Sequence, residues 1–283
     1  MKTDRPPQPD FLIIGAQKCG TTWLHHHLSR HPGIYFPAQK ELEFFSYATH
    51  LAHPGMSRYR EHFAPAGHRM CGEATASYFW TWSDAPWCKM PDGFQKNIPG
   101  VVRSLLSPEL RLILCLRNPV ERAISAWGHY LATGEVHPDL CFREACEYGG
   151  IVDMGFYARH LSRWLEAYRA EQFLVLTLED DIMANPRQAL LKTSRFLNIE
   201  PFSSDNEYLD KKVFPGPDRK PTGSGGNQGI TIQLDALDRQ VEISASDIDW
   251  LTRLYQADQA ALSRLLAATP AWSASATGAQ RYE

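Results

Sequence analysis

Three short, uninterrupted apolar runs limit the folds open to this chain of 283 residues. They are Phe11–Ile14, Leu112–Leu116 and Phe173–Leu176. Runs of this length without polar residues are typical of strands buried on both faces, as in a parallel sheet. A helical pattern follows each run, and such alternation predicts a three-layer α/β fold. We therefore expect a central parallel sheet flanked by helices, with ligands bound at the carboxyl ends of its strands.

The helical segments carry start and stop signals. The expected segments are Thr22–Arg30, a helix capped by Asn118 that starts at Pro119 and stops at Gly134, an amphipathic helix from Tyr157 to Tyr168, a helix opened by Asn185-Pro186, and a last helix from about Ser246. We expect one domain over residues 1–283, with a polar tail over 1–10 and a flexible Gly/Pro-rich loop over 215–229.

Composition excludes several classes of protein. The net charge of −3 argues against a chain that coats nucleic acid. The sequence contains no run of 18 apolar residues, so it predicts no membrane-spanning helix. Its six irregularly spaced cysteines predict free thiols in a reducing compartment, and no zinc motif predicts a metal site. We expect a cytoplasmic protein, although a catalytic fragment of a membrane-anchored parent would have the same composition.

The first strand leads into a glycine loop, FLIIGAQKCGTTW, in which Gly15 and Gly20 are four residues apart. The backbone N–H groups of such a P-loop-like segment, with the helix N-terminus, form a cradle for phosphate oxygens. Lys18 lies inside the loop, whereas a kinase or ATPase loop requires a lysine after the second glycine. We expect an anion site here, and the alternative is a plain glycine turn.

The second strand ends at Arg117, where ATPases usually place an aspartate that holds Mg²⁺. Arg122 and Ser125 follow in the first turns of the next helix. An arginine with a serine hydroxyl at a helix N-terminus is a second anion site. Two such sites predict a nucleotide with phosphates at both ends of its ribose. Pairing of Arg117 with a structural acid is an equal alternative.

Five segments in this order resemble the 3′-phosphoadenosine 5′-phosphosulfate (PAPS)-dependent sulfotransferases, most closely the heparan sulfate N- and 3-O-sulfotransferases and their bacterial relatives. The segments are FLIIGAQKCGTTWL, KELEFF (Lys40–Phe45), GEATASYF (Gly72–Phe79), RNPVERAISAWGHY (Arg117–Tyr130) and GFYARHLSRWL (Gly155–Leu165). The resemblance implies sulfuryl transfer from PAPS to a hydroxyl or amine of a carbohydrate or small-molecule acceptor. It also implies that adenosine 3′,5′-bisphosphate is the product and that the transfer requires no metal.

The resemblance also implies roles for individual residues. Residues Lys18, Cys19, Gly20, Thr21 and Thr22 would hold the 5′-phosphosulfate, with Lys18 at the bridging oxygen. Arg117 and Ser125 would hold the 3′-phosphate, and Arg219 and Lys220 are the candidates for a loop that closes over the cofactor. Glu41 matches the catalytic base of the family and His129 a histidine near the acceptor. We favour Glu41 over His129 as the base, although the pKa of an ordinary histidine lies nearer the operating pH.

Two departures from the family pattern affect acceptor choice. Ala74 stands where family members often carry a lysine, and Glu43 stands where 3-O-sulfotransferases have a histidine. The rival functions are a nucleotide kinase, which lacks its motifs here, and a non-catalytic module that binds adenosine bisphosphate.

Three other groups suggest no separate site. His25, His26 and His27 point about 100° apart on a helix and are expected to be solvated. The acids Glu179–Asp181 predict a solvated turn. The aromatic cluster (Tyr78, Phe79, Trp80, Trp82 and Trp87) is equally consistent with buried core and with a stacking wall for an acceptor.

Overall fold

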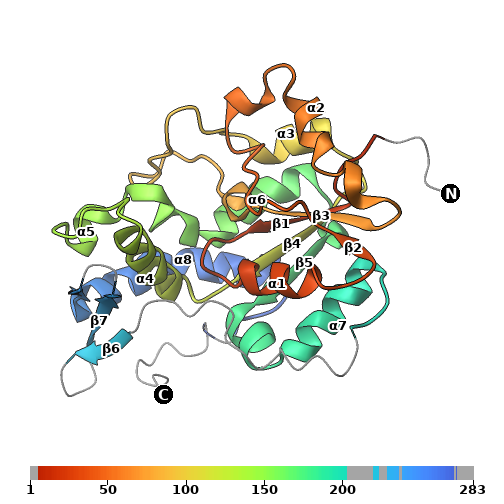
Figure 1. Ribbon diagram of the computed structural model, residues 1–283. Helices are drawn as coiled ribbons and strands as arrows, with labels where there is room; N and C mark the ends of the chain where they lie inside the picture. Colours follow the sequence, from red (N-terminus) through yellow and green to blue (C-terminus); the bar gives the residue numbers. More distant parts are fainter. Residues whose placement is uncertain (1–5, 203–218, 223–227, 236–237, 271, 273–283) are drawn as a thin grey trace. The chain divides into compact units, whose positions relative to one another are not determined.

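A parallel sheet of five strands in the order β2-β3-β1-β4-β5 forms the centre of the computed structural model (Figure 1). The strands are β1 (Phe11–Gly15), β2 (Ile34–Tyr35), β3 (Met70–Ala74), β4 (Arg111–Leu116) and β5 (Phe173–Thr177). The structure describes residues 6–202, 219–222, 228–235, 238–270 and 272. Side chains of β1 and β4 are almost entirely buried, as expected for apolar strands covered on both faces. The predicted α/β class is confirmed.

Helices cover both faces of this sheet. In Figure 1, α1 (Thr21–Leu28) and α7 (Pro186–Leu197) lie on one face, and α3 (Ile98–Leu105) and α6 (Tyr157–Ala167) lie on the other. Helix α2 (Gly55–Glu61) precedes β3. The short helical turns of this region are η1 (Ala48–Leu51), η2 (Ala64–Ala66), η3 (Ala76–Phe79), η6 (Ala170–Gln172) and the π-helical η7 (Leu178–Met183).

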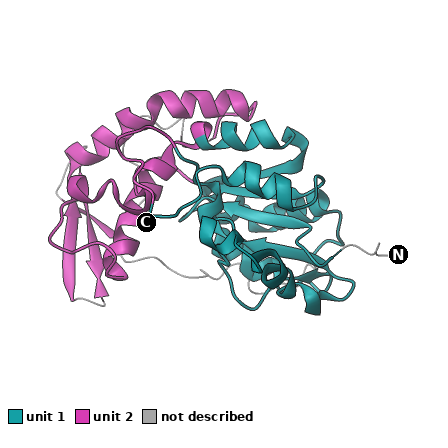
Figure 2. Ribbon diagram, turned by 90° about the horizontal axis from the view of Figure 1, so that it is seen from above, with its two compact units in different colours: residues 1–82, 91–116, 160–214 teal, residues 83–90, 117–159, 215–283 magenta. Residues whose placement is uncertain are grey.

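The chain divides into two compact units, coloured separately in Figure 2. The first unit gathers residues 1–82, 91–116 and 160–214, and it contains the parallel sheet. The second gathers residues 83–90, 117–159 and 215–283. One of the points where the chain passes from the first unit to the second lies between Leu116, the last residue of β4, and Arg117. The single domain expected over 1–283 stays a prediction.

The second unit contains a three-stranded antiparallel sheet packed against helices. The strands β6 (Arg219–Thr222), β7 (Gly229–Leu234) and β8 (Arg239–Ile243) occur in that order. Apolar side chains of β7 and β8 share one core with α4 (Pro119–Ala132) and α8 (Ala245–Leu265). The remaining turns of helix are α5 (Phe142–Ala145), η4 (Tyr148–Gly150) and η5 (Asp153–Gly155). Asn118 caps α4 as predicted, since its Oδ1 accepts from the Val120 N–H at 2.9 Å.

Two sequence expectations differ from the structure. Residues Arg219–Thr222 form strand β6, so a loop over the whole of 215–229 is wrong for this part. Pairing with β7 supplies the hydrogen bonds that outweigh the local proline; residues 215–218 and 223–227 lie outside the described residues. The expected tail is held at its end, because Asp10 Oδ2 accepts from the Cys71 N–H at 2.7 Å.

Among the described residues, no helix combines the length and apolar character that crossing a membrane requires. The same residues contain no group of three or more His, Cys, Asp or Glu side chains placed to bind a metal. None of the six cysteines, all of them in the described part of the chain, forms a disulfide.

Candidate active site

The glycine loop connects β1 to the N-terminus of α1. Gly20 precedes α1 with φ 93°, and no described side chain caps that helix. The first-turn N–H groups of a helix lack intrahelical acceptors and carry the positive end of its dipole. A Cβ on Gly20 would lie 2.8 Å from Ile182 Cδ1, so glycine is required for both conformation and space. Lys18, which has φ 66°, and Cys19 lie in this loop, and Thr21 and Thr22 begin α1 directly after it.

A second motif lies beside this loop. Ala76, in η3, donates its N–H to Glu41 Oε2 at 2.7 Å. The Ala76 carbonyl oxygen lies 2.8 Å from the position that a Cβ on Gly15 would occupy. The carboxylate of Glu41 and the start of the glycine loop thus flank the same turn. The glycine loop and the candidate base Glu41 therefore lie next to each other in the first unit.

The segment 41–46 runs along the segment 73–78 and is bound to it at several points. The contacts are Glu41 N–H to Ala74 O at 3.0 Å, Glu43 N–H to Thr75 Oγ1 at 3.4 Å, Phe45 N–H to Tyr78 OH at 3.4 Å, and Ser46 Oγ with Ser77 Oγ at 2.8 Å. The KELEFF and GEATASYF segments therefore lie side by side and are joined by hydrogen bonds. The 73–78 segment is joined in turn to β1, because Thr75 N–H donates to Ile13 O at 3.1 Å.

Lys40 holds the second oxygen of the Glu41 carboxylate. Its ammonium forms an ion pair with Oε1, while Oε2 accepts from Ala76. The two side chains are partly exposed, at 24% for Lys40 and 34% for Glu41. The two contacts therefore fix the carboxylate in one orientation. It still reaches solvent, so an acceptor could approach it from that side. Lys40 also lies near His25, whose pKa is lowered to about 4 by burial and then by this lysine.

Glu73 is a buried carboxyl that the sequence motifs did not single out as functional. Its side chain is 1% exposed and accepts from three hydroxyls, those of Tyr59, Thr75 and Tyr78. Burial raises the pKa of Glu73 to about 7, the hydrogen bonds oppose that rise, and the nearby Glu41 charge adds to it. The available signal was its position at the end of β3, at the same sheet edge as the glycine loop.

In the second unit, Arg117 and Arg219 converge on one acid. Arg117 donates to Glu121 Oε2 at 3.3 Å, and Arg219 donates to the same oxygen at 3.1 Å. The alternative in which Arg117 pairs with an acid is thus what the structure contains. One carboxylate between two guanidinium groups leaves a net positive cluster. Each arginine has five N–H donors, so the cluster retains capacity for a further anion.

The other predicted residues of this unit, Arg122, Ser125 and His129, lie on helix α4. Ser125 is buried, and His129 is half-buried one turn further along the same face. Arg122 is fully buried and donates to the carbonyl oxygens of Gly150 and Ile151, so it holds a loop and does not face an anion site.

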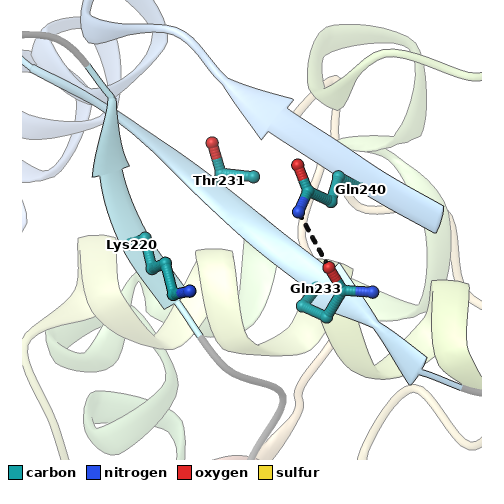
Figure 3. A pocket seen from close by; sticks show the side chains of 4 residues that line it. All are labelled: Lys220, Thr231, Gln233 and Gln240. Atoms are coloured by element: carbon teal, nitrogen blue, oxygen red, sulfur yellow. Dashed lines mark hydrogen bonds between the residues drawn. The ribbon is translucent and has the colours of Figure 1, made fainter. Parts of the chain in front are cut away.

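Lys220 does not share the cluster of its neighbour Arg219. Consecutive strand residues point to opposite faces of a sheet. Figure 3 shows Lys220 in a shallow pocket with Thr231, Gln233 and Gln240, where Gln240 Nε2 donates to Gln233 Oε1 at 2.9 Å. The two residues predicted together as cofactor ligands are therefore in different surroundings.

The histidine run on α1 is less solvated than expected. His27 is fully buried with its ring 4.5 Å from that of Trp23, because both lie on the face of α1 that packs inward. The expectation of a solvated face is wrong for this residue. The acids after β5 are partly ordered by local contacts, since Asp181 accepts from Thr177 N–H at 2.7 Å and pairs with Lys192.

The aromatic cluster, expected to be either buried core or a stacking wall for an acceptor, contains both buried and exposed members. Tyr78, Phe79 and Trp80 are at most 2% exposed and belong to the core. Trp82 is 37% exposed, with Lys96 Nζ 4.9 Å from its ring centroid. In the other unit, Trp87 stacks on Phe156 with ring centroids 6.4 Å apart.

Comparisons with known proteins agree with these motifs. A family model described as "Sulfotransferase domain" matches residues 8–213. Carbohydrate sulfotransferase 15 of Rattus norvegicus is 28% identical over 270 residues, covering 75% of this chain and 48% of that protein. Bifunctional heparan sulfate N-deacetylase/N-sulfotransferase 1 of Homo sapiens is 31% identical over 209 residues, covering 68% of this chain and 22% of that protein.

The chain thus spans about half the length of the first relative and about a fifth of the second. Among solved structures, a sulfotransferase from Alicyclobacillus acidocaldarius matches with a TM-score of 0.64 and 24% identity, covering 94% of this chain and 99% of that one. This likeness shows the fold.

Proposed function

The chain belongs to the sulfotransferase family, and from this premise we propose that it transfers a sulfuryl group from PAPS to a hydroxyl or amine of an acceptor. One observation carries the proposal: the Glu41 carboxylate and the Lys18 glycine loop flank the same turn, η3. An anion cradle beside a fixed carboxylate fits the transfer of an anionic group to an acceptor that must lose a proton.

We propose that Lys18, with the backbone from Cys19 to Thr22, binds the 5′-phosphosulfate. In the transfer, the acceptor oxygen or nitrogen bonds to sulfur, and the bond from sulfur to the bridging phosphate oxygen breaks. That oxygen leaves on adenosine 3′,5′-bisphosphate, and its growing charge is stabilised by Lys18 and the loop N–H groups. Replacing Lys18 by Met should lower kcat by roughly 10²–10³-fold. Lys192→Met, on α7, is the matched control.

We propose Glu41 as the base that takes the acceptor proton, with His129 as the alternative. The contacts of Glu41 with Ala76 and Lys40 support this choice, because a base must be held within reach of the proton it removes. Glu41→Gln should abolish most turnover, and His129→Ala should retain more of it. Wild-type turnover in Glu41→Gln would reject the assignment.

We propose that Arg117, Ser125 and Arg219 bind the 3′-phosphate of the nucleotide. Support comes from the convergence of the two guanidinium groups on Glu121. A thermal-shift comparison tests nucleotide choice: adenosine 3′,5′-bisphosphate should raise the melting temperature, and ATP with Mg²⁺ should not. Stabilisation by ATP alone would favour a kinase.

The names of the relatives support a carbohydrate as the acceptor. Incubation with labelled PAPS and a panel of glycans, glycosides and phenols should give labelled sugar products. We further propose a reducing compartment such as the cytoplasm, supported by six cysteines that remain thiols. Cell fractionation tests this.

A further inference from the structure

We propose that Glu73 is a positioning residue for Glu41. Its buried carboxylate orients the hydroxyls of Thr75 and Tyr78, and these hydroxyls hold the backbone that carries Glu41. The inference rests on the proposed role of Glu41 as the base.

The orientation of the two hydroxyls follows from the chemistry of the carboxylate. Glu73 Oε1 accepts from Thr75 Oγ1 at 3.0 Å and from Tyr78 OH at 2.6 Å. Above its pKa of about 7 the Glu73 carboxyl is ionised and is an acceptor only, so each hydroxyl hydrogen points toward it. The lone pairs of both hydroxyl oxygens are then left for donors on the other side.

Those donors are backbone amides of the segment that follows Glu41. The Glu43 N–H donates to Thr75 Oγ1 and the Phe45 N–H donates to Tyr78 OH, each at 3.4 Å. Without the carboxylate, a hydroxyl hydrogen could turn toward the amide and remove its acceptor. Glu73 therefore determines whether the segment has acceptors for these amides.

The segment requires such external contacts. Glu41 has φ 60° and Glu43 has φ 51°, a left-handed conformation that residues with a Cβ adopt rarely. Two such residues so close together persist only where the surroundings hold them. Contacts of Glu41 with Ala74 and Ala76 hold one end, the Ser46–Ser77 hydrogen bond holds the other, and the two hydroxyls bind the amides between them.

Tyr59 provides a matched control. Its hydroxyl donates to the other oxygen of the same carboxylate, Oε2, and its ring stacks on Phe44 with centroids 4.5 Å apart. In the described structure it accepts from no amide of residues 41–46. Tyr59→Phe removes a buried hydroxyl from Glu73 and keeps the ring that packs against Phe44.

The experiment measures steady-state kinetics with PAPS for Thr75→Val, Tyr78→Phe and Tyr59→Phe, each in the wild-type and Glu41→Gln backgrounds. Thr75→Val and Tyr78→Phe should lower kcat about 10- to 100-fold with little change in the KM for PAPS. Tyr59→Phe should stay within about 2-fold, and Thr75→Ser should restore activity. In the Glu41→Gln background the first two changes should cause no further loss, because they act through Glu41. Additive losses, or an equal loss in Tyr59→Phe, would overturn the proposal.

Amide hydrogen exchange separates this inference from the proposed function. Thr75→Val should speed exchange at Glu43, Tyr78→Phe should speed it at Phe45, and Tyr59→Phe should change neither. Unchanged exchange in all three variants would overturn the positioning role whether or not the protein transfers sulfate. A wild-type protein that transfers nothing from PAPS would reject the proposed function. The hydrogen-exchange result would still show whether the Thr75 and Tyr78 hydroxyls protect the Glu43 and Phe45 amides.

Discussion

Glu73 and His27 are both buried ionisable side chains, and their surroundings differ. Three hydroxyls donate to Glu73. Neither ring nitrogen of His27 has a hydrogen-bond partner among the described residues. Burial raises the pKa of Glu73 to about 7 and lowers the pKa of His27 to about 4, since in each case it disfavours the charged form. The two residues therefore make the stability of the protein depend on pH in opposite directions.

Glu73→Gln should reduce the loss of stability as pH rises. The carboxyl is protonated in both states below pH 4.5, ionises only in the unfolded chain up to about pH 7, and ionises in both states above that. Between these values the unfolded state binds fewer protons, so the wild-type free energy of unfolding falls by about 3 kcal/mol. Urea unfolding from pH 4.5 to 8 measures this, with the exposed Glu61→Gln as control. An unchanged slope in Glu73→Gln would contradict the prediction.

His27→Leu should stabilise the protein. The change removes two buried nitrogen atoms without partners and retains apolar packing against Trp23, so the free energy of unfolding should rise by about 1–3 kcal/mol. Wild-type stability should also fall as pH drops from 6.5 toward 4, because the unfolded state then binds more protons, and the variant should lose this dependence. Thermal unfolding measures both effects. His26→Leu, on the neighbouring position of α1, should change stability far less, and an equal gain there would contradict the cause given.

At the scale of elements, the alternation of side chains along strand β6 places its neighbouring cations Arg219 and Lys220 on different faces. Arg219 joins Arg117 at Glu121, and Lys220 lies with glutamine and threonine side chains on another face of β6. The loop proposed from sequence to carry both is in part a strand, and only one of the pair lies beside Arg117.

Arg219→Ala should weaken binding of adenosine 3′,5′-bisphosphate about 10-fold or more, since a charge-assisted hydrogen bond is lost. Lys220→Ala should change the affinity less than about 2-fold, within the ordinary range for an exposed charge. Calorimetric titration of both variants distinguishes them. A larger loss for Lys220→Ala would reverse the assignment.

The glycine loop gives a second prediction at this scale. Gly20→Ala places a Cβ 2.8 Å from Ile182 in a backbone with φ 93°, so it should lower both stability and nucleotide affinity. Gly93→Ala has a similar φ of 74° with nothing within 4 Å, and it should cost only about 1 kcal/mol of stability. Equal effects of the two variants on nucleotide affinity would show that the loop backbone is not at the ligand.

At the scale of the whole molecule, the sequence predicts the elements whose local pattern is strong. Strands β1, β4 and β5 are uninterrupted apolar runs, and helices α4 and α7 begin with Asn-Pro, so each was expected at its observed place. Strand β2 is only two residues long, and β3 contains Glu73, so neither shows an apolar run. Strands β6 to β8 contain alternating polar residues and a proline, and tertiary pairing decides their structure.

The site was predictable to a similar extent. Lys18, Glu41 and Arg117 became candidates from motif order, because each lies in a segment that resembles the family, and their roles stay predictions. The contacts between segments were not predictable, since the bonds from residues 41–46 to residues 73–78 join positions about thirty apart in the chain. Glu73 was missed because its proposed role depends on the fold bringing the hydroxyls of Tyr59, Thr75 and Tyr78 around one buried carboxyl.

Glu121 makes the arginine pair a site that is already occupied by an anion of the protein itself. Any phosphate that binds Arg117 and Arg219 would share their guanidinium groups with this resident carboxylate, so its affinity would be the attraction of two cations less the repulsion of one acid. The two ion pairs with Glu121 hold the guanidinium groups together before a nucleotide arrives.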